Sequence, residues 1–420
     1  MWSCQAFVSA SVSSLESGLV RSRPEIAAPA ASESFSIVIA MVPNALLGLS
    51  FILKSKRAQP IRLDRERSMA IIISDDDVRK HLTMAECIEA MDVCFGDFAE
   101  GKAKTLPRLR YRVDAPDDPG REYFANVHVG AVPSYGMACV RAGSNMLAKS
   151  SAPGRKTTSS PDSYNWTVIT LYDLNTAEPL AFLHESHLSG VRVGATTGVA
   201  VDKIARDDVA ELGLFGTGRQ ARANCEAICT ARPSIKRVKV YSPTQENREA
   251  FPGQVPLEGV EIIPVESSEE VLAGVDIVCS MTNSTKPTFD GNLLQEGQMV
   301  ISVANSDVTL KRHEVDETTF ERASDIVIND WESVVTNQQT ELLDMIERGA
   351  VDQDRVVELG RLCTGEKTVK QSNENIVYYK NNTGLGMQFA AAGAVIYNKM
   401  KNDDTNRVVP REWLAAEDYP

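Results

Sequence analysis

The chain has 420 residues, which is enough for two or three domains. Apolar residues make up 43% of it, so a full hydrophobic core can form and global disorder is excluded. The formal net charge is −13, and an acidic protein does not offer the basic face that nucleic acid requires. We therefore expect no nucleic-acid partner.

The N-terminal extension, residues 1–68, contains an uncharged run at 34–53 that is followed by three basic residues. Twenty uncharged residues can just span a bilayer, although Pro43 and Gly48 weaken that interpretation. The extension is a membrane anchor, a targeting segment, or sequence upstream of a true start at Met69. We favour the third interpretation, because Met69 opens directly into a strand and an acidic helix cap. A membrane partner is expected only if 34–53 is an anchor.

Eight cysteines are scattered along the chain without a Cys-x-x-Cys pair. Such a distribution is typical of reduced thiols, and we expect a cytoplasmic protein. Cys225 and Cys229 are four residues apart and would share a helix face, where we expect two small buried side chains. No suitably spaced third and fourth ligand accompanies them, so we expect no metal site.

The first half of the chain combines one helical segment with several strands. Asp75 to Asp77 precede apolar residues at helical spacing up to Gly101, which predicts a single helix. Strands are predicted at 108–113, 123–130, 137–142, 166–173 and 179–184, and a polar loop at 149–165. The strand–turn–strand at 166–184 is typical of an antiparallel sheet.

The second half alternates short strands with helices. Strands are predicted at 209–215, 238–241, 260–263, 276–281, 299–304 and 326–329, and helices at 194–206, 220–231, 267–273, 315–323, 331–349 and 386–401. This alternation predicts an α/β fold with a doubly wound parallel sheet. We expect a Rossmann domain at 206–349, inserted into a discontinuous α+β substrate and dimerisation domain formed by 69–205 and 350–420.

The sharpest motif is Gly216-x-Gly218-x-x-Ala221, which follows an apolar strand and opens a helix. In this context the first glycine permits a tight turn, the second lets the backbone approach a pyrophosphate, and the alanine keeps the helix close to the sheet. The N–H groups of the helix N-terminus would face the phosphates. The motif predicts dinucleotide binding by residues 216–220, including Thr217, Arg219 and Gln220.

The end of the next strand bears on the choice between NAD and NADP. NAD sites usually place a carboxylate there for the ribose hydroxyls, and this chain has Tyr241 and Ser242 instead. Ser242, Thr244 and Arg248 could bind a 2′-phosphate, although Arg248 could equally be a solvated helix residue. We therefore favour NADP slightly over NAD.

From Met69 to Lys401 the chain resembles the ornithine cyclodeaminase/mu-crystallin family. The pieces that carry the resemblance follow the family's order: LYDLNTAEPLAFLHESHLSGVRVGATTGVA, LGLFGTGRQA, DIVCSMTNSTKPTF, VISVANSDVTLKRHEVD and NNTGLGMQFAAAGAVIY. The resemblance implies that Arg192 binds the substrate carboxylate and that Asp307 is the acid–base residue. It implies substrate contacts for Arg141 and for Arg108 or Arg110, and cofactor contacts for Thr282 and Asn305.

Three positions depart from the family's pattern. Arg141 stands where members commonly carry a lysine, and an arginine cannot give up its proton at ordinary pH, so we expect an anion clamp rather than a proton shuttle. Asn305 replaces a glycine, and Phe389 stands where relatives often have an aspartate. The last two departures put strict ornithine cyclodeaminase activity in doubt.

Three functional hypotheses follow. The first is an NAD(P)-dependent oxidoreductase of a small amino or imino acid, either a ketimine reductase or an amino acid dehydrogenase. The second is a cyclodeaminase-type lyase, in which the cofactor undergoes no net change. The third is a non-enzymatic binding protein of the mu-crystallin kind. The resemblance also implies a homodimer formed through the non-Rossmann domain.

Overall fold

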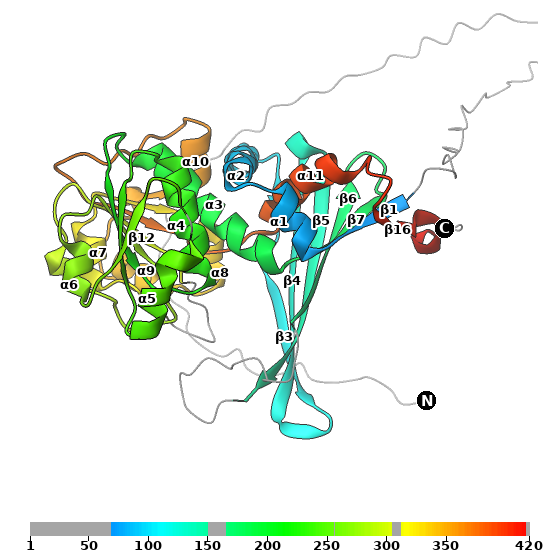
Figure 1. The fold of residues 1–420 in the computed structure, drawn as a ribbon, viewed down its shortest axis with the longest axis horizontal. Coiled ribbons are helices and arrows are strands. Elements are labelled where there is room, and N and C mark those ends of the chain that lie inside the picture. The colour runs from blue at the N-terminus through cyan, green and yellow to red at the C-terminus, as the bar shows by residue number, and fades with distance from the viewer. Residues whose placement is uncertain (1–68, 150–164, 256, 305–311, 417–420) are drawn as a thin grey trace, which may run out of the picture. The chain divides into compact units, whose positions relative to one another are not determined.

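The computed structural model describes residues 69–149, 165–255, 257–304 and 312–416. Two eight-stranded sheets organise these residues (Figure 1). One sheet is mixed, and the other is entirely parallel. Within the described residues no helix is long and apolar enough to cross a membrane. The N-terminal extension, with its apolar run, lies outside the described residues.

The mixed sheet has the strand order β16-β1-β7-β6-β5-β4-β2, with β3 paired to β4. Its strands are β1 (Met69–Ile73), β2 (Lys104–Thr105), β3 (Leu109–Ala115), β4 (Asp118–Val132), β5 (Met137–Ala148), β6 (Trp166–Asp173), β7 (Pro179–His184) and β16 (Arg407–Pro410). All neighbouring strands of this sheet are antiparallel except β1 and β7, which pair with each other in parallel. The predicted strand pair at 166–184 is confirmed to the residue.

The predicted single helix after Ser74 is wrong, because the chain forms two helices, α1 (Asp75–His81) and α2 (Met84–Ala99). Thr83 starts the second helix with a capping box, in which its side chain accepts from the N–H of Glu86 and the Glu86 carboxylate accepts from the N–H of Thr83. The apolar spacing continues across this break, which hides it from a periodicity argument.

The parallel sheet has the order β10-β9-β8-β11-β12-β15-β13-β14. Its strands are β8 (Glu211–Phe215), β9 (Arg237–Tyr241), β10 (Glu261–Pro264), β11 (Ile277–Ser280), β12 (Met299–Ser302), β13 (Asp325–Ile328), β14 (Val356–Glu358) and β15 (Val377–Lys380). Its helices are α4 (Arg219–Ala231), α5 (Gln245–Gln254), α6 (Ser268–Leu272), α7 (Glu317–Arg322), α8 (Trp331–Thr336), α9 (Thr340–Glu347) and α10 (Leu359–Cys363). All six predicted strands are confirmed.

The parallel sheet also corrects the expected domain boundary at 349. Strands β14 and β15 pair with β13, so residues assigned to the substrate domain belong to the parallel sheet as far as Lys380. The expected helix at 331–349 is two helices, α8 and α9, and α5 was not predicted. These helices are short, with ten residues in α5, six in α8 and eight in α9.

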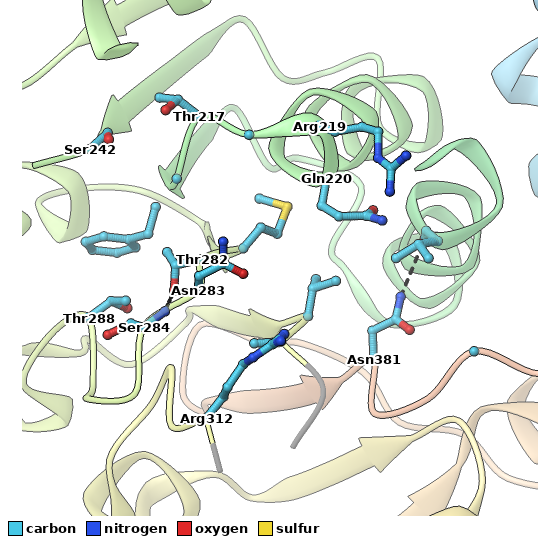
Figure 2. Close-up of a pocket in the computed structure, with 18 of the residues that line it drawn as sticks. Thr217, Arg219, Gln220, Ser242, Thr282, Asn283, Ser284, Thr288, Arg312 and Asn381 are labelled. Carbon is cyan, nitrogen blue, oxygen red and sulfur yellow. Dashed lines mark hydrogen bonds between the residues drawn. The ribbon is translucent and has the colours of Figure 1, made fainter. Parts of the chain in front are cut away.

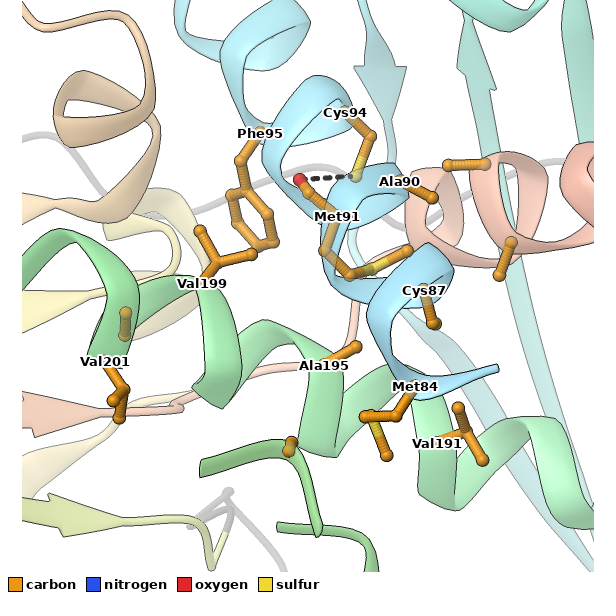
Figure 3. Packing of buried hydrophobic residues seen from close by; sticks show 14 of the residues in the cluster. Met84, Cys87, Ala90, Met91, Cys94, Phe95, Val191, Ala195, Val199 and Val201 are labelled. Atoms are coloured by element: carbon orange, nitrogen blue, oxygen red, sulfur yellow. Dashed lines mark hydrogen bonds between the residues drawn. The ribbon is translucent and has the colours of Figure 1, made fainter. Parts of the chain in front are cut away.

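Helix α3 (Ser186–Ile204) begins earlier than predicted and packs against both α2 and α4. Figure 3 shows its face toward α2, where Val191, Ala195 and Val199 meet the apolar side of that helix. On the side toward α4, a side chain at position 194 would collide with the carbonyl group of Ala223. Glycine therefore lets the two helix backbones come into direct contact.

Helix α11 (Gly386–Met400) lies on the mixed sheet, chiefly over β4 and β5. Its first residue is in backbone contact with β4, since a side chain at Gly386 would collide with the carbonyl of Val129. The carbonyl of Gly386 accepts a hydrogen bond from the thiol of Cys139, and the N–H of Gly386 donates to the hydroxyl of Thr105. The N-terminus of α11 is thereby fixed, together with Gln388 and Phe389 one turn later.

Candidate functional site

A cavity of about 910 Å³ lies at the carboxyl ends of β8, β9, β11, β12 and β15. This is the edge of a parallel sheet at which ligands bind, beside the point where the strand order reverses between β8 and β11. Figure 2 shows Thr217, Arg219 and Gln220 on one side of the cavity and Arg312 and Asn381 on another. Arg108, just before β3, and Arg192, on α3, also line the cavity.

The glycine turn after β8 has the conformation that its sequence predicts. Gly216 has a φ of +104°, and a side chain there would collide with the carbonyl oxygen of Met281. Its N–H donates to the carbonyl of Tyr241 at 2.9 Å, which joins the turn to the neighbouring strand. Only glycine combines this φ with this close approach.

Gly218 is the N-cap of α4, and a Cβ placed there meets no heavy atom within 4 Å in the described part of the chain. The opening of the 13-residue helix therefore faces open space in the cavity. Residues 216–220 all line the cavity, and Ala221 behind them is fully buried. Free N–H groups and the positive end of the helix dipole make this turn suitable for a pyrophosphate.

The residues proposed to choose between NAD and NADP divide into two groups. Ser242 is buried and lines the cavity. Thr244 is exposed at the N-cap of α5, and Arg248 donates to the carbonyl of Ser242 at 3.3 Å. Neither Thr244 nor Arg248 is among the lining residues. Both lie close to the end of β9, and neither makes a contact that distinguishes NADP from NAD.

Glu314 was missed by the sequence analysis, although it organises the loops after β11 and β12. Its carboxylate accepts hydrogen bonds from the N–H groups of Val303 and Ala304, and from the N–H and hydroxyl of Thr282. Burial raises the pKa of Glu314, and these donors oppose the shift. Thr282 was expected to contact the cofactor, and it lines the cavity in an orientation set by Glu314.

A polar network fixes the turn that follows β15. Asn381 donates to the carbonyl of Val193 and to the hydroxyl of Thr197 on α3, both at 3.1 Å. The amide of Asn329 donates to Asn381 and to the carbonyl of Thr383. Beside this turn Lys380 forms a buried ion pair with Glu341 on α9, with an N–O distance of 3.0 Å. None of these interactions has a local sequence signature.

Arg192 on α3 lines the cavity and is buried. Its guanidinium donates to Gln388 on α11 and lies 4.7 Å from the ring centre of Phe389. Burial lowers the pKa of Arg192 to about 10, which leaves it charged at neutral pH. A side chain at position 384 would collide with this guanidinium, so Gly384 makes room for it.

The other candidate arginines have different surroundings. Arg108 lines the cavity, whereas Arg110 is exposed and is absent from the lining. Arg141 is buried outside the lining and forms an ion pair of 2.9 Å with Glu185. Arg312, which the sequence analysis did not select, lines the cavity. The candidates Asn305 and Asp307 lie outside the described residues.

A family model described as the ornithine cyclodeaminase/mu-crystallin family matches residues 69–404. The chain belongs to this family. The match begins at the first described strand and extends past α11, so it covers the whole parallel sheet and the mixed sheet except β16. The resemblance stated from the sequence is therefore confirmed.

Curated relatives include a delta(1)-pyrroline-2-carboxylate reductase of Bacillus cereus, 24% identical over 78% of this chain and 96% of the relative. An alanine dehydrogenase of Archaeoglobus fulgidus is 25% identical over 78% of this chain and 94% of its own length. These family members are reductases and dehydrogenases of imino and amino acids.

Solved structures show the same fold. One is Thermococcus litoralis delta(1)-pyrroline-2-carboxylate reductase in complex with NADH and L-proline, which is 24% identical with a TM-score of 0.65. The match covers 81% of this chain and all of that one. Another is a probable ornithine cyclodeaminase from Bordetella pertussis, which is 23% identical with a TM-score of 0.66. That match covers 80% of this chain and 99% of the other. The predicted fold class, with its Rossmann-type parallel sheet, is confirmed.

Proposed function

We propose that this protein is an NAD(P)-dependent oxidoreductase that reduces a small imino acid to the amino acid, or catalyses the reverse reaction. One observation carries the proposal. A single cavity of about 910 Å³ is lined by the glycine turn at 216–220 and, elsewhere on its wall, by Arg108 and Arg192. A dinucleotide cradle and two carboxylate-binding side chains thus share one space.

The cofactor fits the residues present. The left-handed Gly216 and the open space beside Gly218 suit a pyrophosphate, and relatives of this fold bind NADH or NAD+. When bound, the nicotinamide supplies or accepts the hydride. The slight preference for NADP rests on Ser242, which lines the cavity at the end of β9, where NAD sites usually carry a carboxylate.

The chain's own residues bind and orient the substrate. Arg192, held by Gln388, binds the substrate carboxylate with a planar pair of N–H donors, and Arg108 adds a second cation. Arg141 contributes positive charge through its position beside Arg192 at the ring of Phe389. Asp307, assigned by family resemblance alone, exchanges the proton with the imine nitrogen.

Two domains divide this work. The mixed sheet with α1, α2, α3 and α11 supplies the substrate arginines, and the parallel sheet supplies the nucleotide cradle. The second boundary between them follows Lys380 rather than residue 349. The proposed substrate domain is discontinuous, and its C-terminal part begins after Lys380.

The substrate domain also carries the proposed homodimer surface. Leu109, Val127, Ala142 and Val168 are successive partners across β3, β4, β5 and β6, so they share one face of the sheet. Leu109 is 66% exposed and Val168 is 49% exposed. An exposed apolar face of this kind is typical of a protein interface, and an archaeal alanine dehydrogenase of the same fold is described as a dimer. The proposed occupant is a second copy of this chain.

The test is a spectrophotometric assay with purified protein. NADH or NADPH is mixed with 1-pyrroline-2-carboxylate, or with pyruvate and ammonia, and absorbance of the reduced nicotinamide is followed. Steady oxidation supports the proposal. Release of ammonia from ornithine without net change of the cofactor would instead identify a cyclodeaminase. Failure to bind either nucleotide would overturn the proposal.

A further inference from the structure

A second cavity, of about 350 Å³, lies between α1, α3, α4 and the end of α5. Among the described lining residues, Arg219 alone belongs to both this cavity and the larger one that holds the glycine turn. The proposed reaction uses none of the other side chains around the second cavity. They therefore need an explanation of their own.

Helix α4 presents charged side chains to the second cavity at positions 219, 222 and 226. These positions are three and four residues apart, so they share one face of the helix. Arg219 donates to the carbonyl of Ser186 at 3.2 Å, and Arg222 donates to the side-chain oxygen of Gln254 at 2.7 Å. Both acceptors are neutral, so in the described chain neither guanidinium is paired with a carboxylate.

Glu226 lines the same cavity one turn beyond Arg222. This spacing suits an ion pair along the helix, but the described structure has none here, because the guanidinium of Arg222 binds Gln254 instead. Burial raises the pKa of Glu226, with no described cation or donor opposing it. The second cavity therefore contains a carboxylate that has no cationic partner.

His187 adds a neutral donor to the wall of the second cavity. Nη1 of Arg79 lies 2.9 Å from Nδ1 of His187, and a guanidinium can only donate, so Nδ1 accepts. Burial and the charge of Arg79 lower the pKa of His187, so the ring is neutral and carries its proton on Nε2. Arg79 itself forms an ion pair of 2.9 Å with Asp75. The unpaired positive charge of the wall thus comes from Arg219 and Arg222.

These groups define the chemistry of a ligand. The guanidinium groups of Arg219 and Arg222 suit a carboxylate, and Glu226 suits an ammonium group. Val191 and Val255 supply apolar surface for a short side chain. A simple anion would leave Glu226 without a partner, and a simple amine would leave both arginines without one. An amino acid in its zwitterionic form satisfies all three charges.

We propose that the second cavity is a regulatory site that binds a small amino acid as its zwitterion and thereby weakens nucleotide binding through Arg219. Arg219 is the first residue of α4, directly after the N-cap Gly218. Its guanidinium is directed toward α3 (Figure 2), where it donates to Ser186. A ligand carboxylate in the second cavity holds the guanidinium there and keeps its charge away from a pyrophosphate at the glycine turn. This coupling rests on the proposed function, whereas the site itself does not.

Calorimetric titration of the full-length protein without nucleotide tests the site. L-alanine is the probe, and propionate and L-alaninamide carry its carboxylate and its ammonium group separately. We expect L-alanine to bind at least about tenfold more tightly than either compound, because each lacks one charge-assisted contact. Propionate that binds as tightly as L-alanine would overturn the zwitterion site.

Two variants assign the binding to this cavity. Arg222→Gln and Glu226→Gln each remove one charge and keep a polar side chain, and unchanged melting temperatures would show that both fold. Each should weaken L-alanine binding by about 10- to 100-fold. Arg348→Gln is the matched control, because Arg348 is exposed beyond α9, pairs with Glu317 and should bind L-alanine as the wild type does.

Arg192→Lys separates the two cavities. L-alanine bound in the second cavity should retain its affinity in this variant, since Arg192 lines only the larger cavity. Binding that is lost in R192K and retained in R222Q would place L-alanine in the substrate site and overturn the proposal.

The coupling is measured by fluorescence titration with NADH. Saturating L-alanine should raise the NADH dissociation constant of the wild type at least about fivefold, the lower end of allosteric effects, and should leave that of E226Q unchanged. An equal effect in both proteins, or none in the wild type, would reject the regulatory role. If the protein binds no nucleotide, the proposed function fails, and calorimetry still decides whether the second cavity binds an amino acid.

Discussion

Arg192 and Gln388 lie on different helices, and the guanidinium of Arg192 donates a hydrogen bond of 2.7 Å to Oε1 of Gln388. The amide nitrogen of Gln388 in turn donates to Thr196, one turn along α3 from Arg192. The hydroxyl of Thr196 donates to the carbonyl of Arg192. The guanidinium is thereby held by a closed set of contacts before any substrate arrives.

Replacing Arg192 by lysine should impair substrate binding. A lysine keeps the charge but loses the planar fork that binds a carboxylate and contacts Gln388. We expect kcat/KM for the imino acid to fall by about 10- to 100-fold, the range for charged hydrogen bonds. Steady-state kinetics and NADH titration check this, and the surface variant Arg348→Lys serves as control. Unchanged kcat/KM would remove Arg192 from the substrate site.

Replacing Gly216 by alanine should weaken nucleotide binding. The φ of +104° strains any other residue, and the new methyl group would displace the carbonyl of Met281. Strain of this kind costs about 1–3 kcal/mol, so we expect the NADH dissociation constant to rise by about 5- to 150-fold. Fluorescence titration measures it. Gly253→Ala is the matched control, since its Cβ meets open space within the described structure. Equal affinities in both variants would contradict the assigned cradle.

The buried His128 predicts a pH dependence of stability. In the folded protein the pKa of His128 is lowered by burial and by the arginines around it. Its contribution to the free energy of unfolding is therefore complete above the pKa of an unfolded histidine, about 6.5, and is lost as the pH falls below that value. From pH 7.5 to 5.5, this residue alone should lower the free energy of unfolding by about 1.4 kcal/mol. Urea denaturation at both pH values measures the slope. The same slope in His128→Asn would show that His128 titrates normally.

The ion pair between Lys380 and Glu341 predicts strong coupling. Both side chains are about 95% buried, so removing one partner leaves an uncompensated charge. Lys380→Met and Glu341→Leu should each destabilise the protein by about 3–5 kcal/mol, and the double variant should recover a large part of that loss. Thermal and urea unfolding of the wild type, the two single variants and the double variant measure the four stabilities that this double-mutant cycle needs. Simple additivity would mean that the pair contributes no interaction energy.

The exposed sheet face predicts how the dimer can be broken. Val168 is 49% exposed on the proposed interface, so an aspartate there should leave the fold intact and put charge into an apolar contact. We expect Val168→Asp to be monomeric in analytical ultracentrifugation. Leu293→Asp, at a 44% exposed position beside the parallel sheet, should remain dimeric. A dimeric Val168→Asp would place the interface elsewhere.

Local patterns predicted most elements correctly, and their limits have physical causes. Gly216, Gly218 and Ala221 could be assigned from sequence because a single turn fixes their spacing. Strand β14, which has only three residues, and strand β15, which has four, were not predicted. The break between α1 and α2 was missed, since apolar periodicity continues through a capping box.

The site residues divide in the same way. Arg192 and Arg108 could be selected through family resemblance, and both line the cavity. Glu314 and Asn381 act through hydrogen bonds to backbone groups of other segments, 10 and 188 residues away, which no motif records.

The glycine contact between α3 and α4 restricts how the enzyme can move. Arg192 lies two residues before Gly194, and the backbone that Gly194 touches belongs to the helix that begins at the dinucleotide turn. Such closely fitted backbones resist sliding, so we expect the carboxylate grip and the phosphate grip to move together. We therefore expect substrates to enter and leave without sliding of α3 along α4.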